Sequence, residues 1–136
     1  MKVKLDPGAY PPEYAHNTDG GMDIKAPHPQ RIMPGESAVF RTGVHVELPE
    51  GTAGLLVSKS GLNVKHDLLS TGLIDRGYTG EIVIKLYNHG SESYLVDRGD
   101  KISQLVVIPV RHEEIEIVDD LESTERGENG FGSTGK

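Results

Sequence analysis

The sequence predicts an all-β protein, a jelly-roll-like β-barrel subunit with a flexible glycine-rich C-terminal arm. Short segments alternate apolar and polar residues with a period of two, as strands with one buried face do. Turn signals that contain Gly or Pro recur between these segments. Only residues 60–69, SGLNVKHDLL, favour a short helical turn, and many short strands without a long helix are typical of barrels and jelly-roll sandwiches.

The first clearly alternating segment is residues 37–49, SAVFRTGVHVELP. After its glycine, Val44, Val46 and Leu48 point to one face of the predicted strand, and the polar residues between them point to the other. This pattern predicts a strand that packs its apolar face on a core and leaves the other face to solvent.

Three later segments also favour strands. In residues 81–88, EIVIKLYN, two isoleucines and a leucine share one face. Residues 101–110, KISQLVVIPV, are rich in β-branched side chains, which suit strands. Residues 113–118, EEIEIV, alternate acidic residues with isoleucine. We therefore expect a strand in each of the three.

The chain divides into a compact body and an arm. At 136 residues it is long enough for one domain with a sizeable core. Residues 113–125 contain seven acidic residues and no Lys or Arg, and glycines follow. Because charge crowding and glycine both oppose packing, we assign residues 1–118 to a β-barrel domain and residues 119–136 to a mobile arm or lid. Extended, about 18 residues span roughly 60 Å, enough to reach a neighbouring subunit.

The composition excludes several classes of protein. A net charge of −7 argues against a protein that coats nucleic acid, because binding to a phosphate backbone needs a basic surface. The chain has no cysteine, so it has neither a disulfide framework nor a thiolate metal site, and its six histidines show no close pairing. No apolar run approaches the roughly 20 residues of a membrane helix, and the N-terminus lacks a signal-peptide core. We expect a cytoplasmic protein without membrane contact.

Five stretches are candidates for a binding site. The first, DGGMDIKA, sets Asp23 at a predicted strand start beside paired glycines, although alone it reads as a turn. The second, VSKSGLNVKHD, groups Lys59, Ser60 and Gly61. A cation, a hydroxyl and free N–H groups beside a glycine turn can gather phosphate oxygens. A polar turn with Ser60 as the N-cap of a helix is a compatible structural interpretation.

The third stretch is residues 70–82, STGLIDRGYTGEI. Asp75 follows an apolar pair at a predicted strand end, where a partly buried carboxylate can hold a water molecule as a general base does. Tyr78 beside Gly77 offers a flat ring next to open backbone, which suits a sugar or a base. An ordinary β-turn with a surface Asp is the structural alternative.

The fourth stretch, RGDKISQLV, places Gln104 in an apolar strand, where its amide must find partners in the backbone or in a ligand. An adhesion motif at 98–100 is disfavoured, because three residues are a weak signal. The fifth stretch is the arm, with RGENGFGSTG at 126–135. Glycines around Phe131 free the backbone to fold onto a ligand, and Arg126 suits a phosphate.

These five stretches, in this order and spacing, resemble the five motifs of the trimeric deoxyuridine triphosphate nucleotidohydrolases (dUTPases), from about Asp19 to Gly135. The resemblance implies a jelly-roll subunit and a homotrimer with active sites at subunit interfaces. It implies hydrolysis of dUTP to dUMP and pyrophosphate with Mg²⁺, which limits uracil in DNA and supplies dUMP for thymidylate synthesis. Magnesium would be held by the substrate phosphates and not by protein ligands.

The resemblance also implies roles for single residues. Asp75 falls where the family has the carboxylate that orients the attacking water. Tyr78 falls on the ring that packs against the deoxyribose and would clash with a 2′-hydroxyl. The backbone of Gly72, Leu73 and Ile74 falls on the segment that reads the uracil edge.

Two groups would bind the phosphates and close the site. Asp23 matches a supporting acid near the phosphates. Residues at phosphate-binding positions are Lys59, Ser60, Gly61 and Gln104. Residues that match the C-terminal lid are Arg126, Phe131, Gly132, Ser133 and Thr134, with Phe131 stacking on uracil. A lid of this kind excludes water and aligns the phosphates when it closes.

The sequence departs from the family pattern at two positions. The second motif usually reads Pro-Arg-Ser-Gly, and here Ser58 and Lys59 replace its first two residues. Lys59 keeps the charge but loses the planar fork of Arg. Leu69 lies near the position where some members place an Asn on the uracil, so base reading is expected to rest on backbone groups.

Two alternatives to a dUTPase remain. A dCTP deaminase of the same fold needs a catalytic Glu on the strand after the hairpin, and Lys85 lies there instead. A regulatory trimer would keep the motifs but signal through protein contacts, with the acidic stretch 113–125 as a candidate surface.

Overall fold

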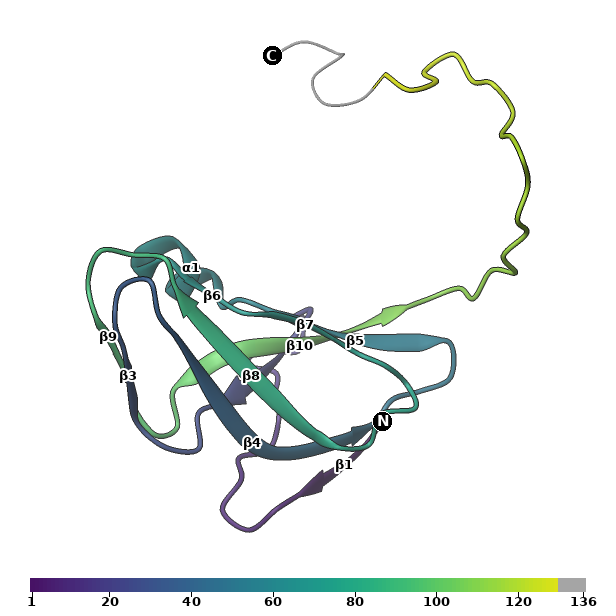
Figure 1. Ribbon diagram of the computed structural model, residues 1–136. Helices are drawn as coiled ribbons and strands as arrows, with labels where there is room; N and C mark the ends of the chain where they lie inside the picture. Colours follow the sequence, from purple (N-terminus) through teal and green to yellow (C-terminus); the bar gives the residue numbers. More distant parts are fainter. Residues whose placement is uncertain (130–136) are drawn as a thin grey trace.

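The computed structural model describes residues 1–129; residues 130–136 lie outside the described part. It consists of antiparallel strands and one short helix within that range (Figure 1). The elements are β1 Lys2–Leu5, β2 Met22–Lys25, β3 Gln30–Ile32, β4 Ser37–Glu47, β5 Thr52–Val57, α1 Ser60–His66, β6 Leu68–Leu69, β7 Thr71–Ile74, β8 Glu81–Asn88, β9 Tyr94–Val96 and β10 Lys101–Pro109. The all-β, jelly-roll-like prediction is confirmed.

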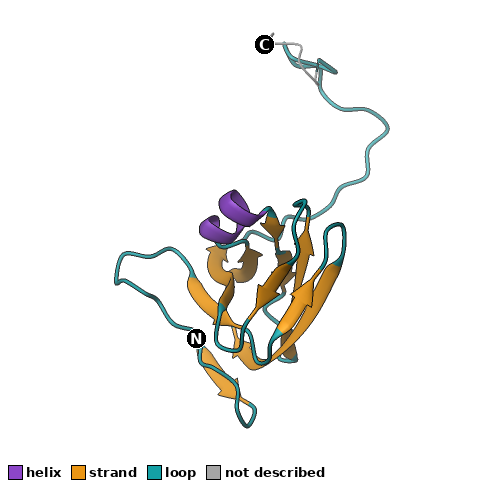
Figure 2. Ribbon diagram, turned by 90° about the vertical axis from the view of Figure 1, so that its left-hand side faces the viewer, coloured by secondary structure: helices purple, strands orange, loops and turns teal. Residues whose placement is uncertain are grey.

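Two four-stranded sheets build the body, in the orders β1-β4-β8-β6 and β2-β10-β5-β7. A two-stranded ribbon of β3 and β9 lies beside them. Figure 2 shows the strands as the bulk of the body, with the helix at one end of it. The order is not sequential, and β10 lies between β2 and β5, so the second sheet joins residues from both halves of the chain.

The core draws apolar side chains from both sheets. Val44, Val46 and Leu48 are buried, as the alternation in 37–49 predicted. The apolar face of β8 is also buried, and Phe40 of β4 lies among these side chains with no exposed surface. Period-two patterning identified these strands because one face of each packs on this single core.

The predicted strand at 113–118 is wrong for the single chain. β10 ends at Pro109, and the chain then leaves the body as an extended segment without strand pairing as far as residue 129 (Figure 1). Ile115 and Ile117 are 91% and 94% exposed. Alternation supplies an apolar face, but a strand also needs a neighbour for its backbone groups, and none lies beside this segment within the described chain. The domain boundary at residue 118 stays a prediction.

The expected helical turn is present as α1, but Ser60 is not its N-cap. Lys59 occupies the N-cap position, and its carbonyl oxygen accepts a hydrogen bond from the Asn63 N–H. Ser60 is the first helical residue. The helix ends at His66 and is capped by Asp67, whose φ of 52° is left-handed and whose N–H donates to the Asn63 carbonyl.

The turn at 98–100 has a structural explanation. Gly99 takes a φ of +90°, which side chains other than glycine rarely adopt. The Asp100 carboxylate accepts a hydrogen bond from the Asp97 N–H at 2.8 Å. The Arg98 guanidinium lies 5.8 Å from the centre of the Tyr10 ring. This turn closes the β9–β10 connection.

In the described part of the chain, no helix has the length and apolar character to cross a membrane.

Candidate functional site

One row across the second sheet joins residues from four of the five predicted stretches. Asp23 of β2 pairs with Gln104 of β10, which pairs with Val57 of β5, which pairs with Thr71 of β7. Lys59 lies two residues beyond Val57, in the turn after β5. Gly72 and Leu73 follow it along β7 and pair with Leu56 and Leu55. Sheet register thus unites motifs that are far apart in sequence.

Asp23 is the buried charge at the end of this row. The residue is 1% exposed, and its carboxylate meets two ammonium groups, Lys59 Nζ at 2.5 Å and Lys101 Nζ at 2.7 Å. The contact with Lys59 is a hydrogen bond, whereas Oδ2, which faces Lys101, has no partner with hydrogen-bond geometry in the described chain. Lys101 Nζ and Asp23 Oδ2 nonetheless form an ion pair.

The ammonium groups decide the ionisation of Asp23. Burial alone would raise its pKa, but Lys101 and Lys59 outweigh burial and hold the pKa below its usual value. The same contact raises the pKa of Lys101. Lys101 was not among the predicted site residues. A cation at the first position of a largely apolar strand was the one signal that marked it.

Lys59 lies in the turn between β5 and α1, and Ser60 is the first residue of α1. The Lys59 ammonium is directed to Asp23, and its side chain is 25% exposed. Ser60 and Gly61 are exposed at the helix start. Gln104 is half-buried in the middle of the sheet row. Contact of these residues with phosphate stays a prediction.

The turn between β7 and β8 carries Asp75 and Tyr78. Asp75 follows the last residue of β7 and is exposed in the single chain, so the expected partial burial is not present there. The Tyr78 N–H donates to the Asp75 carbonyl at 2.9 Å, and the Tyr78 hydroxyl donates to the Glu81 carbonyl at 2.9 Å. Both bonds fix the turn and hold the ring across it.

A hollow of about 250 Å³ opens beside this turn. Its lining residues are Leu73, Ile74, Asp75, Tyr78, Glu81 and Val83. Asp23, Lys59 and Gln104 do not line it. The structure therefore brings the predicted residues together in two groups, and the single chain does not enclose both in one cavity.

Gly80 shapes the hollow and was also missed by sequence reasoning. A Cβ atom at Gly80 would lie 2.5 Å from Cζ of the Tyr78 ring, far inside van der Waals contact. The ring therefore lies directly on the Gly80 backbone. Only the backbone contact reveals this role, because nothing in the sequence distinguishes Gly80 from an ordinary turn glycine.

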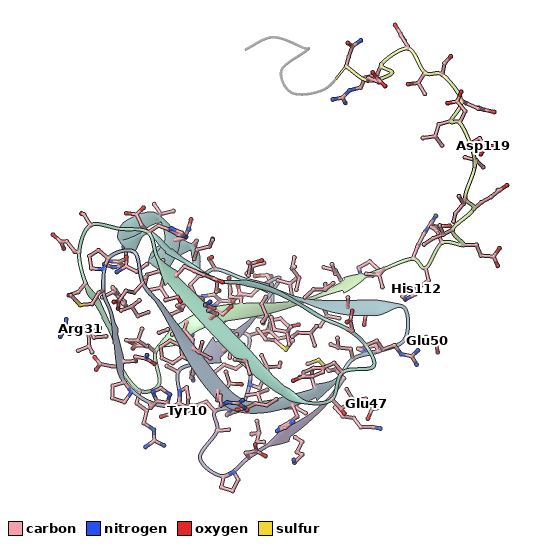
Figure 3. The ribbon with its side chains drawn as sticks, viewed as in Figure 1. Tyr10, Arg31, Glu47, Glu50, His112 and Asp119 are labelled. Atoms are coloured by element: carbon pink, nitrogen blue, oxygen red, sulfur yellow. The ribbon has the colours of Figure 1, made fainter. Side chains whose placement is uncertain are left out.

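The arm lies apart from both groups. The Arg126 Nε donates to the Asn129 carbonyl at 2.9 Å within the arm itself. Figure 3 places Asp119 on this segment, away from the strands. Phe131, Gly132, Ser133 and Thr134 lie outside the described residues. Within residues 1–129, no three side chains of His, Cys, Asp or Glu gather in a way that could hold a metal ion.

Comparison with known proteins identifies the family. The dUTPase family model matches residues 9–135, nearly the whole chain. The chain belongs to the dUTPase family. A deoxyuridine 5′-triphosphate nucleotidohydrolase of Gloeothece citriformis is 47% identical over 139 residues, which cover 99% of this chain and 96% of that protein.

Solved structures of dUTPases agree with this assignment. The dUTPase of Staphylococcus bacteriophage 80alpha, solved with dUPNHPP, has a TM-score of 0.91 and 36% identity, covering 99% of this chain and 98% of that one; it is described as one of the phage dUTPases that control transfer of virulence genes. A variant of the phage phi11 dUTPase, described as coordinating a structural Mg(II) ion, has a TM-score of 0.81 and 33% identity, covering 90% and 98%.

Proposed function

We propose that the chain hydrolyses dUTP to dUMP and pyrophosphate, with Asp75 as the group that activates water. The observation that carries the proposal is the match of the dUTPase family to residues 9–135, together with Asp75 exposed at the rim of a hollow shared with Tyr78. A carboxylate there is open to water and to a nucleotide. Through its products the reaction would limit uracil in DNA and supply dUMP for thymidylate synthesis.

The proposed step is an in-line displacement at the α-phosphorus. The water oxygen forms a bond to the α-phosphorus, and its proton passes to the Asp75 carboxylate. The bond between the α-phosphorus and the bridging oxygen breaks, and pyrophosphate leaves with the electron pair. General-base assistance of this kind contributes about 10²–10⁴-fold to the rate.

The two groups of residues would bind different parts of the substrate. The β7 backbone at Gly72, Leu73 and Ile74 would read the uracil edge, and the Tyr78 ring would pack on the deoxyribose. A cytosine amino group would meet backbone donors there, and an unpaired buried polar group costs about 1–3 kcal/mol. The residues proposed for phosphate binding are Lys59, Ser60, Gly61 and Gln104, with Asp23 in support.

Magnesium would reach the site on the substrate phosphates. The ion neutralises charge on the polyphosphate and helps to orient it. The family of the chain and the Mg(II) described for the phi11 dUTPase support this cofactor. The lone exposed carboxylate of Asp75 suits a role on water better than one in an all-protein metal cage, which needs several oxygen ligands.

A homotrimer with active sites between subunits is part of the proposal. The two groups of site residues are not enclosed together in one chain, and Ile115 and Ile117, in the extended segment after β10, are almost fully exposed. The arm from Arg126 through Phe131 to Thr134 would then close over a site as a lid.

We infer that the enzyme works in the cytoplasm, where nucleotide synthesis takes place and where a chain without cysteine is at no disadvantage.

A regulatory trimer is the second candidate function. The similarity to the 80alpha dUTPase, described as controlling gene transfer, favours it. A deaminase is disfavoured, because Lys85 on β8 cannot replace the catalytic carboxylate that a deaminase needs at this position. The Lys85 side chain is exposed, and its ammonium lies 4.9 Å from the centre of the Tyr87 ring.

One assay separates these functions. Purified protein and Mg²⁺ are incubated separately with dUTP, dTTP, dCTP and UTP, and pyrophosphate and ammonia are measured. Pyrophosphate from dUTP alone supports the proposed function and its selectivity. Ammonia from dCTP would indicate a deaminase. Binding of dUTP without either product would favour the regulatory trimer and overturn the hydrolase.

A further inference from the structure

Three buried or half-buried serines next to proposed site residues form a ring of hydrogen bonds that closes through the Val57–Ser58 backbone. The Ser58 hydroxyl donates to the Ser70 carbonyl at 3.1 Å and accepts from the Ser70 N–H at 2.9 Å. The Ser70 hydroxyl lies 2.9 Å from the Ser103 hydroxyl. The Ser103 hydroxyl donates to the carbonyl of Val57, the residue before Ser58, at 3.0 Å.

Each hydroxyl proton in the ring has one assignment. The Ser103 hydroxyl donates to the Val57 carbonyl, and the Ser58 hydroxyl donates to the Ser70 carbonyl. Because each hydroxyl has one proton, the Ser70 hydroxyl must donate to the Ser103 oxygen. Ser70 and Ser103 are 3% and 0% exposed, so water cannot replace a lost partner. The ring therefore favours one arrangement of the three segments that it joins.

These segments are the ones that hold the proposed substrate contacts. Ser58 directly precedes Lys59 and Ser60, Ser70 lies two residues before Gly72, and Ser103 directly precedes Gln104. The hydroxyls join the end of β5, the link between β6 and β7, and β10. Ser58 also stands where the family pattern has Pro, which has no side-chain hydroxyl to contribute.

We propose that the Ser58–Ser70–Ser103 ring is a positioning device that fixes the phosphate-binding turn, Gln104 and the uracil-reading strand relative to one another. The inference rests on the proposed function of that site. A displacement of a binding segment by about 1 Å can cost up to 10²-fold in rate. None of the three serines is among the residues proposed to contact the substrate, so the expected effect on turnover acts through the segments that they hold.

The test compares Ser103→Ala, Ser58→Ala and the double variant. We expect each single variant to lower kcat/KM for dUTP by on the order of tenfold and to weaken dUPNHPP binding in parallel. Because the serines hold the same three segments in one arrangement, their effects are coupled, and the double variant should be little worse than the worse single variant. The proposal would be overturned if the fold losses of the two single variants multiply in the double variant. It would also be overturned if the single variants keep kcat/KM within about twofold of the wild type.

A matched control separates positioning from general stability. Thr42 is 2% exposed, donates to the Ile82 carbonyl at 2.6 Å and accepts from the Val44 N–H at 3.2 Å, all within β4 and β8. Thr42→Val should lower the unfolding midpoint at least as much as Ser103→Ala while leaving kcat/KM unchanged. If Ser103→Ala does not fold, Ser58→Ala, at a half-buried residue, decides the outcome.

The proposed function and the ring fail in different ways. A wild-type protein that binds dUPNHPP but does not hydrolyse dUTP would contradict the hydrolase, and the ring would then be judged on the affinities alone. Wild-type hydrolysis with unaffected serine variants would contradict only the ring. A wild-type protein that neither binds nor hydrolyses would contradict both.

Discussion

The carboxylate of Asp23 holds the ammonium group of Lys59 at 2.5 Å, across the gap between β2 and the turn after β5. The Asp23 side chain is 2% exposed and the Lys59 side chain 25%. A carboxylate this deeply buried requires a cation beside it. Lys59, which stands where the family usually has Arg, therefore has a structural partner before any substrate arrives.

Replacement of Asp23 by Asn should destabilise the fold. The amide keeps the shape but removes the negative charge that both Lys59 and Lys101 contact, and we expect a loss of about 2 kcal/mol, as for other charged hydrogen bonds. The measurement is the free energy of unfolding in urea. Glu13→Gln is the control, because it removes an exposed carboxylate that pairs with Lys25 and should cost less. An equal loss in both variants would contradict the assigned role of burial.

Asp75→Asn should abolish most turnover while binding survives. The amide cannot take a proton from water, so kcat should fall by on the order of 10²-fold or more. Affinity for dUPNHPP, measured by calorimetry, should change little. Asp67→Asn is the control, since Asp67 is exposed and Asn tolerates its left-handed backbone. Turnover near that of the wild type in Asp75→Asn would remove Asp75 as the base.

Deletion of residues 126–136 should lower turnover strongly without altering assembly. The proposed lid residues are lost, whereas all strands of the body lie before residue 110. Assembly is followed by light scattering and activity by release of pyrophosphate. A truncated protein that assembles as the full chain does and keeps full activity would contradict the lid.

Local patterns predicted the strands, and register explains what they missed. β4, β8 and β10 follow from alternation and β-branched residues, which are local properties. Residues 113–118 have the same pattern but no pairing strand in the described chain. The resemblance located Asp23, Lys59 and Gln104, but the contact between Lys101 and Asp23 depends on the pairing of β10 with β2. No local pattern contains that information.

The contact between Tyr78 and Gly80 predicts a change in sugar selectivity. In Gly80→Ala the new methyl group would lie within 3 Å of the ring, so the exposed end of the Tyr78 side chain must move. We expect the preference for dUTP over UTP, as a ratio of kcat/KM values, to fall by about tenfold, within the range that pocket shape alone supplies.

The same turn provides the control for this substitution. A Cβ atom at Gly77 meets nothing within 4 Å, so Gly77→Ala should leave the ratio unchanged. Equal ratios in the wild type and both variants would show that the position of the ring does not set sugar selectivity.

The two hydrogen bonds of the His45 ring predict that the stability of the fold depends on pH. Its Nε2 faces Asp6 Oδ2 and its Nδ1 faces the Thr79 carbonyl, each at 3.1 Å. Both partners only accept, so the ring makes both hydrogen bonds only when it carries both protons. The bond to Asp6 and the bond to Thr79 raise the pKa of His45 above its usual value, against burial and the nearby Lys4.

The sign of the effect follows from this raised pKa. The contribution of protonated His45 to stability is fully present below the pKa of His45 in the unfolded chain, about 6.5. This contribution is lost as the pH rises through the higher pKa of His45 in the folded protein. The difference in Tm between the wild type and His45→Gln should therefore be larger at about pH 6 than at about pH 8.5. His112→Gln, at an exposed residue of the segment after β10, is the matched control substitution. A difference in Tm that stays constant between the two pH values would mean that His45 is not protonated in the fold.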